Sequence, residues 1–177
     1  LVRNLASWQM LIAEAPGLPL IGDYSLNVAN DLTAKLLIEQ RFAYLTPSYD
    51  LNFDQLRDMI RHCTAAWFEV TLQQYMPMFH MEHCVFCRFL SEGTDSSNCG
   101  RPCESHEVRI RDRVGHEHPI KADFGCRNTV FNAVPQSGAA YLAPLLELGL
   151  KRYRLDLLLE DRLRTNETIT LYQQALR

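Results

Sequence analysis

Short apolar runs and amphipathic segments alternate along most of this chain, and this alternation restricts the fold more than any other feature. Residues 5–15 have the spacing of an amphipathic helix, with apolar side chains on one face. Pro16 and Gly17 end that segment, and the apolar run 18–23 then reads as a buried strand. Helix and strand recur about every 20 residues with short connections, which is typical of βα units on a parallel sheet.

The same pattern predicts the remaining elements. Further helices are expected at 32–40, from Asn52 onward, at 139–148 and from Thr165 or Asn166 to the end of the chain, and further strands at 42–46, 66–72 and 151–157, with 123–131 partly extended. Cys63 falls on the apolar side of the helix that follows Asn52, so we expect a small core residue there and not a ligand.

The sequence therefore predicts an α/β fold of parallel βα units. About four or five units are too few to close an eight-stranded barrel, so we expect either an open layer or the C-terminal half of a TIM-like barrel. Barrel units are expected at 1–75 and 133–177, with a cysteine-rich, metal-binding segment at 76–132 between them. Loops that follow parallel strands share one rim, where we expect Asn27, Asp50 and the cysteines.

The segment 76–132 holds five of the six cysteines, and most of the histidines. Two residues separate Cys84 from Cys87, and three separate Cys99 from Cys103. Such short spacings let two thiolates converge on one metal centre. Four interpretations remain open: an iron–sulfur cluster, a structural zinc ion with sulfur or histidine ligands, a redox-active pair at Cys84 and Cys87, and unligated thiols.

Composition narrows the functional classes. The net charge is −3, so the chain as a whole has no electrostatic attraction to nucleic acid. Several basic residues near the cysteines are either a solvated loop or the contacts of an anionic ligand; they are Arg101, Arg109, Arg111, Arg113, Lys121 and Arg127. No run approaches the roughly 20 apolar residues of a membrane span, and no signal peptide is visible. Clustered thiols without a secretion signal predict a reduced, cytoplasmic protein, and the start at Leu1 predicts a piece of a longer chain.

Other catalytic motifs are weak. His80, Glu82 and His83 lack the spacing of helical zinc proteases, and the chain contains no G-x-S-x-G string and no glycine-rich phosphate loop. A cysteine nucleophile would pair Cys84 with His80 or His83, but a group of five thiols is an unusual setting for one.

Several strings, in order, resemble one family. They are SLNVAN at 25–30, PSYDL at 47–51, an acidic strand at Glu69 that leads to FHMEHC at 79–84, and NCGRPC at 98–103 with Cys126 beyond it. Together they are similar to the collagenase-like peptidases, U-type peptidase family thirty-two, over nearly the whole chain.

The resemblance implies a barrel whose C-terminal part is this chain. It also implies relatives that hydroxylate transfer RNA, ribosomal RNA or the ubiquinone ring without oxygen and carry a 4Fe–4S cluster on four cysteines. By position, Cys84, Cys99 and Cys126 match the first, third and fourth ligands. Cys87 is the nearest candidate for the second, and Cys103 matches a cysteine that only some members use.

We therefore expect an iron–sulfur enzyme that acts on RNA or an aromatic small molecule, with Glu69, His80 and His83 handling substrate or protons. A partner subunit, or a missing N-terminal half of the barrel, is the expected protein partner. The alternatives are a collagenase-like peptidase and a zinc-stabilised RNA-binding module.

Overall fold

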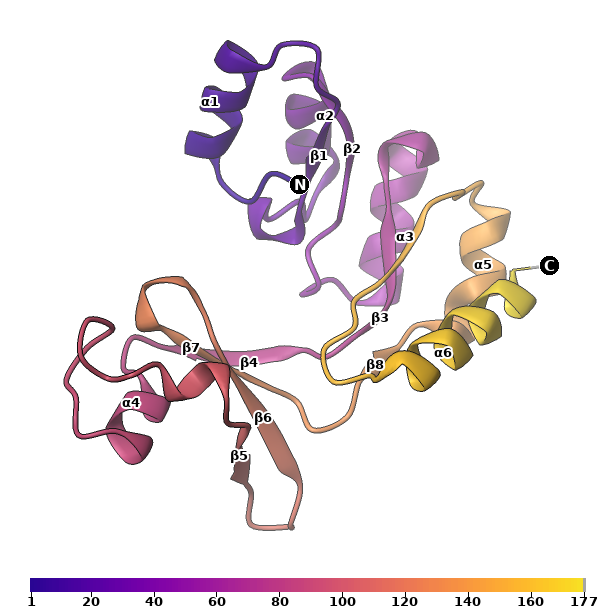
Figure 1. Ribbon diagram of the computed structural model, residues 1–177. Coiled ribbons are helices and arrows are strands. Elements are labelled where there is room, and N and C mark those ends of the chain that lie inside the picture. Colours follow the sequence, from indigo (N-terminus) through magenta and orange to yellow (C-terminus); the bar gives the residue numbers. More distant parts are fainter. Residues whose placement is uncertain (177) are drawn as a thin grey trace. The chain divides into compact units, whose positions relative to one another are not determined.

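The computed structural model describes residues 1–176 apart from the side chain of Phe124, and these residues divide into two compact units (Figure 1). The large unit comprises residues 1–73 and 137–177, and the small unit comprises residues 74–136. The predicted cysteine-rich segment 76–132 lies within the small unit. The two stretches expected to carry βα units contribute to one unit, although they are distant in sequence.

Helices and short parallel strands alternate in the large unit. In chain order the elements are α1 (Leu5–Glu14), β1 (Leu20–Gly22), α2 (Asp31–Glu39), β2 (Phe42–Leu45), α3 (Phe53–His62), β3 (Val70–Gln74), β8 (Gln136–Ser137), α5 (Leu142–Glu147), β9 (Tyr153–Leu155) and α6 (Arg162–Ala175). Their order agrees with the alternation expected from the sequence. The chain is therefore a mixed α/β protein.

Parallel pairing connects four of these strands, and β8 is a further neighbour of β3. β1 pairs with β2, and β3 pairs with β9, both in parallel. Single parallel bridges join Val2 to Gly22 and Leu45 to Phe68, so the segment at Val2, β1, β2, β3 and β9 are successive neighbours. Within the described residues these strands form no closed barrel.

The core of the large unit lies where helices cover this row of strands. Its most buried side chains include Val2, Leu45, Phe68, Leu72 and Leu145, each at most 2% exposed. Cys63 packs against this core from the end of α3 and is only partly exposed, as its place in the helical pattern predicted.

Asparagine caps account for the beginnings of three helices. Asn4, Asn30 and Asn52 each accept a hydrogen bond from the backbone N–H three residues later, at 2.8–3.0 Å. Gln55 also accepts from the backbone of Asn52 at 3.0 Å, which completes a capping box at α3. These polar caps satisfy N–H groups that the first helical turn leaves without partners.

Several predicted boundaries differ from those of the structure, and two of the differences have a clear local cause. The last helix begins at Arg162 and not at Thr165 or Asn166, because Asp161 caps it by accepting from the N–H of Arg164 at 2.8 Å. The strand expected at 66–72 begins at Val70, because residues 65–67 form a 3-10 turn whose N–H groups bond locally. Both errors come from local hydrogen bonds that hydrophobic periodicity does not report.

The small unit is an antiparallel sheet with one helix. Its elements are β4 (Pro77–Met81), α4 (Val85–Leu90), β5 (Val108–Arg111), β6 (Glu117–Ala122) and β7 (Asn128–Phe131). The strand order is β4-β7-β6-β5, and every pairing is antiparallel. Phe86, Ile120 and Val130 form its core. Within this unit the sequence pattern predicts extension only at 123–131, so the other strands of the sheet were not predicted.

None of the helices formed by residues 1–176 is both long enough and apolar enough to cross a membrane.

Candidate functional site

Five cysteines of the small unit come from three separate segments. Cys84 and Cys87 lie at the start of α4, Cys99 and Cys103 in the loop that follows it, and Cys126 in the turn between β6 and β7. All five are free thiols, and Cys87 is the most buried of them at 6% exposed. The antiparallel sheet, which connects β4 to β7, therefore brings the first and last of these segments to the same part of the unit.

These thiols influence one another. The pKa of Cys87 is raised by burial, and further by the negative charges that Cys99, Cys84 and Cys126 would carry as thiolates. Burial also raises the pKa of Cys103, with smaller contributions from Cys84 and Cys99. Such mutual effects require short separations. Yet no three Cys, His, Asp or Glu side chains of the described chain are arranged to hold a metal ion as they stand. The thiols are gathered, but they do not form a finished coordination shell.

N–H groups point at two of the sulfur atoms. The Cys84 sulfur accepts from the backbone N–H of Cys87 at 3.4 Å and from the side-chain amide of Asn128 at 3.8 Å. The Cys99 sulfur accepts from the backbone N–H of Arg101 at 3.4 Å. Hydrogen bonds to sulfur of this kind also surround the cysteine ligands of iron–sulfur clusters.

Asn128 holds the Cys84 segment against β7. Its side chain is fully buried, and its Oδ1 accepts from the backbone N–H of Val85 at 2.7 Å. Its Nδ2 donates to the carbonyl of Arg127 at 2.8 Å as well as to the Cys84 sulfur. One amide therefore joins two segments that lie 43 residues apart in the sequence.

Both loops that bring the later cysteines contain left-handed residues. Gly100 and Arg101 have φ of 66° and 52°, and Gly125 and Cys126 have φ of 74° and 62°. A non-glycine residue in this region costs roughly 1–2 kcal/mol. Arg101 and Cys126 therefore carry backbone strain beside the thiols, as residues at functional sites often do.

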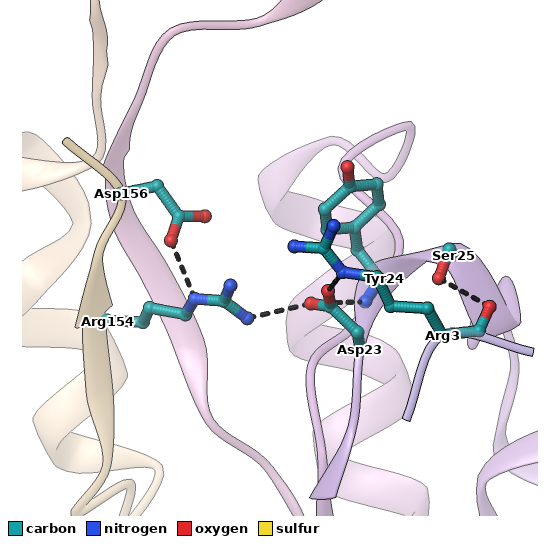
Figure 2. A network of polar contacts seen from close by, with 6 residues as sticks. All are labelled: Arg3, Asp23, Tyr24, Ser25, Arg154 and Asp156. Atoms are coloured by element: carbon teal, nitrogen blue, oxygen red, sulfur yellow. Dashed lines mark hydrogen bonds and ion pairs between the residues drawn. The ribbon is translucent and has the colours of Figure 1, made fainter. Parts of the chain in front are cut away.

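The large unit has a second polar cluster, at the carboxyl ends of its parallel strands (Figure 2). Asp23, directly after β1, is fully buried. Its Oδ2 accepts from Arg3 Nε at 2.7 Å, and its Oδ1 accepts from Arg154 Nη1 at 2.7 Å and from the backbone N–H of Tyr24 at 3.0 Å. Arg154 Nε also donates to Asp156 at 2.7 Å. Two guanidinium groups therefore hold one buried carboxylate.

The pKa values of Asp23 and of the nearby Glu69 are shifted in opposite directions. Burial on its own raises the pKa of Asp23, but the hydrogen bonds and charges of Arg154, Tyr24 and Arg3 outweigh it and leave the pKa below 3.8. The pKa of Glu69 is raised, mainly by burial; Arg154 opposes this, and Asp156 and Asp23 add to it. Glu69 therefore lies beside the network with a pKa shifted in the opposite direction to that of Asp23.

The family model for peptidase family U32 matches residues 1–177. The chain belongs to this family. Neither a curated protein nor a solved structure matches it. The strings that suggested the family from the sequence are thus distributed over both units of a U32 chain: those at 25–30 and 47–51 in the large unit, and those at 79–84 and 98–103 in the small one.

The other predicted site residues of this U32 chain make no hydrogen bonds to the five cysteines within the described part of the chain. His80, on β4, is exposed, and its Nδ1 is 2.8 Å from the hydroxyl oxygen of its cross-strand neighbour Thr129. His83 is exposed in the turn before α4. Glu69 belongs to the large unit and lies near the Asp23 network. No hydrogen bond between either histidine and a cysteine occurs among the described residues.

Asp23, Arg154, Asp156 and Arg3 were missed by sequence reasoning. Two of them had a visible signal, because Asp23 and Asp156 are acidic residues that directly follow short strands. Nothing local connects them, since Asp23 and Arg154 lie 131 residues apart in the sequence.

Gly93 supports the Cys99 loop by its lack of a side chain. A Cβ atom built at Gly93 would lie 2.5 Å from the Cys99 Cα and 2.6 Å from the Asn98 carbonyl oxygen. Because these are backbone atoms, Gly93→Ala should displace the loop and lower the free energy of unfolding by about 1–3 kcal/mol, measured by urea denaturation. Gly17→Ala is the control, because no described atom lies within 4 Å of its Cβ position. Equal stability of the two variants would contradict this packing.

Proposed function

We propose that this U32 chain is part of an enzyme whose small unit holds a 4Fe–4S cluster through Cys84, Cys87, Cys99 and Cys126, with Cys103 as a further ligand candidate. The proposal rests on one observation: cysteines from three separate segments meet, since Cys84 is bonded to Asn128, two residues after Cys126, and Cys87 lies within hydrogen-bonding range of Cys99. Clusters of this kind are held by cysteine thiolates, and hydrogen bonds to sulfur tune their potentials. The N–H groups directed at Cys84 and Cys99 fit that requirement.

When bound, such a cluster would supply one-electron chemistry. We infer that the reaction is an oxygen-independent hydroxylation of RNA or of an aromatic small molecule, with Glu69, His80 and His83 binding substrate or moving protons. Asn128 would position Cys84, and the parallel strands of the large unit would form part of a TIM-like barrel that another subunit or further chain completes. We infer a reducing cytoplasm as the location, because free thiols persist there.

Metal analysis of the anaerobically purified chain tests the cluster. We expect a brown protein with about four iron atoms and as many inorganic sulfides per chain. Cys84→Ser should lose most of the iron, because it removes a proposed ligand whose sulfur accepts two N–H hydrogen bonds. Cys63→Ser is the matched control, since Cys63 packs against the other unit's core, and it should keep its iron.

Two results would replace this proposal. A colourless protein with stoichiometric zinc and salt-dependent RNA affinity would indicate a zinc-stabilised binding module. Cleavage of a peptide that is lost in Cys84→Ser but survives removal of iron would indicate a peptidase, which the family name also allows.

A further inference from the structure

The parallel strands of the large unit have a polar face that carries none of the cysteines proposed to hold the cluster. Val2, Gly22, Leu45 and Phe68 are bridged to one another in sequence order, so their side-chain positions point to one face, the face of the apolar core. The residue that follows each of them points to the opposite face. These four residues are Arg3, Asp23, Thr46 and Glu69.

Backbone hydrogen bonds keep these residues at one level. The backbone N–H of Asp23 donates to the carbonyl oxygen of Val2 at 2.9 Å. In the same way the N–H of Thr46 donates to the carbonyl of Gly22 at 2.8 Å, and that of Glu69 to the carbonyl of Leu45 at 2.9 Å. Each polar residue is therefore beside the next one across the strands.

Arg154 shares this face from the far side of the row. It is paired with Thr71, two residues beyond Glu69, and alternation places Thr71 and Glu69 on the same face. Its contact with Asp23 passes over the two intervening strands, β2 and β3. The face is thus polar from the segment at Arg3 to β9.

Arg3 and Arg154 keep N–H groups that the network does not use. Arg3 contributes only Nε and Arg154 only Nε and Nη1 to the contacts in Figure 2, whereas a guanidinium has five N–H donors. Asp23 lies between the two cations, and Asp156 pairs with Arg154 on its other side, so the two arginines and two aspartates have no net charge. The unused donors suit an oxyanion, because guanidinium groups bind carboxylate and phosphate with paired hydrogen bonds.

Thr46 provides an independent indication. Its side chain is 2% exposed, and its hydroxyl has no hydrogen-bond partner among the described residues. Buried hydroxyl groups nearly always have a partner. A polar group left without one, between Asp23 and Glu69 on the same face, indicates a site whose hydrogen bonds are completed by a ligand.

Glu69 determines how such an anion would be accommodated. Its carboxyl has no hydrogen bond within the described residues, and Arg154, Asp156, Asp23 and Arg152 act on it electrostatically. An incoming anion would be repelled by the ionised carboxylate and accepted by the neutral acid. Anion binding and proton uptake by Glu69 should therefore occur together.

We propose that Arg3, Arg154, Thr46 and Glu69 form a binding site for the carboxylate or phosphate group of a substrate, with Asp23 positioning both arginines. All of these residues belong to the large unit, so binding here needs none of the proposed cluster ligands, and Glu69 is the one residue shared with the proposed function. Binding strengthens as the pH falls, because the protonated form of Glu69 is the one that accepts the anion.

The full chain can be titrated with acetate and with inorganic phosphate at constant ionic strength, following backbone amide shifts of residues 3, 23 and 46 by NMR. We expect saturable shifts with at least one probe, and the probe that binds more tightly identifies the group. The affinity for acetate, which stays ionised, should increase between pH 8 and pH 6. Arg3→Gln should weaken binding about tenfold, since it removes one charge-assisted contact.

Arg61→Gln is the matched control, because the Arg61 side chain is 59% exposed, close to the 63% of Arg3, and lies on α3. It should bind as the wild type does. Thr46→Val removes only the hydroxyl without a partner, so it should fold normally and bind more weakly. The proposal is overturned if neither probe gives saturable shifts, if Arg61→Gln loses as much affinity as Arg3→Gln, or if both Arg3→Gln and Thr46→Val bind like the wild type.

Discussion

Replacing Asp23 by alanine should lower the free energy of unfolding by about 3–5 kcal/mol, which is typical of breaking a buried ion pair from one side. Asp23 is fully buried and accepts from Arg3 and Arg154 at 2.7 Å each. Without the carboxylate, the guanidinium of Arg154, whose side chain is 15% exposed, loses its fully buried partner and keeps only the partly exposed Asp156. Urea unfolding followed by circular dichroism measures the loss.

Asp54→Ala is the control for this prediction. Asp54 pairs with Arg57 at 2.8 Å, a distance much like those of the Asp23 pairs, but its side chain is 73% exposed. Water screens an exposed pair, so we expect a cost below about 1 kcal/mol. If the two variants lost equal stability, burial would not be what makes the Asp23 network important.

The pH dependence of the Asp23 effect has a definite sign. Because its pKa is lowered in the folded state, the ionised carboxylate stabilises the fold at every pH above the ordinary value of 3.8. This contribution is lost as the pH falls through the folded-state pKa. The stability difference between the wild type and Asp23→Ala should therefore be constant near neutral pH and decrease below about pH 4.

Asn128→Ala should destabilise the small unit by about 1–3 kcal/mol and reduce its iron content. The substitution leaves the N–H of Val85 without its partner, and a buried group that loses its hydrogen bond costs about 1–3 kcal/mol. The carbonyl of Arg127 loses the amide but keeps the N–H of Asp123 at 2.7 Å. The substitution also removes the amide that donates to the Cys84 sulfur at 3.8 Å. Urea unfolding and iron analysis of the same preparations give both results.

Asn132→Ala serves as the comparison for Asn128. Its side chain is partly exposed and accepts only from the next backbone N–H, that of Ala133, at 2.9 Å. We expect a change of less than about 1 kcal/mol and full iron content. Retention of iron and stability by Asn128→Ala would show that the Cys84 segment needs no support from β7.

Prediction from the sequence succeeded where the signal is local. The beginnings of α2 and α3 could be predicted from Asn30 and Asn52, because a capping side chain bonds to N–H groups only three residues away. The sheet of the small unit was not predicted, although polar and apolar residues alternate at 107–111 and a turn signal at 112–115 ends in glycine. The density of cysteines favoured the interpretation of this segment as a metal-binding loop. Those strands form because Ile120 and Val130, opposite one another in β6 and β7, are buried together.

The α/β alternation, the family and the residues that could serve as soft ligands can all be predicted from the sequence, because periodicity, caps and short motifs involve neighbouring positions. Tertiary structure alone decided which of these residues meet. Asp23 and Arg154 are joined across 131 positions, and Asn128 reaches the Cys84 segment across 44. Such pairs depend on how strands align side by side, and a pairing shifted by one residue would turn Asp23 or Asn128 to the opposite face of its sheet.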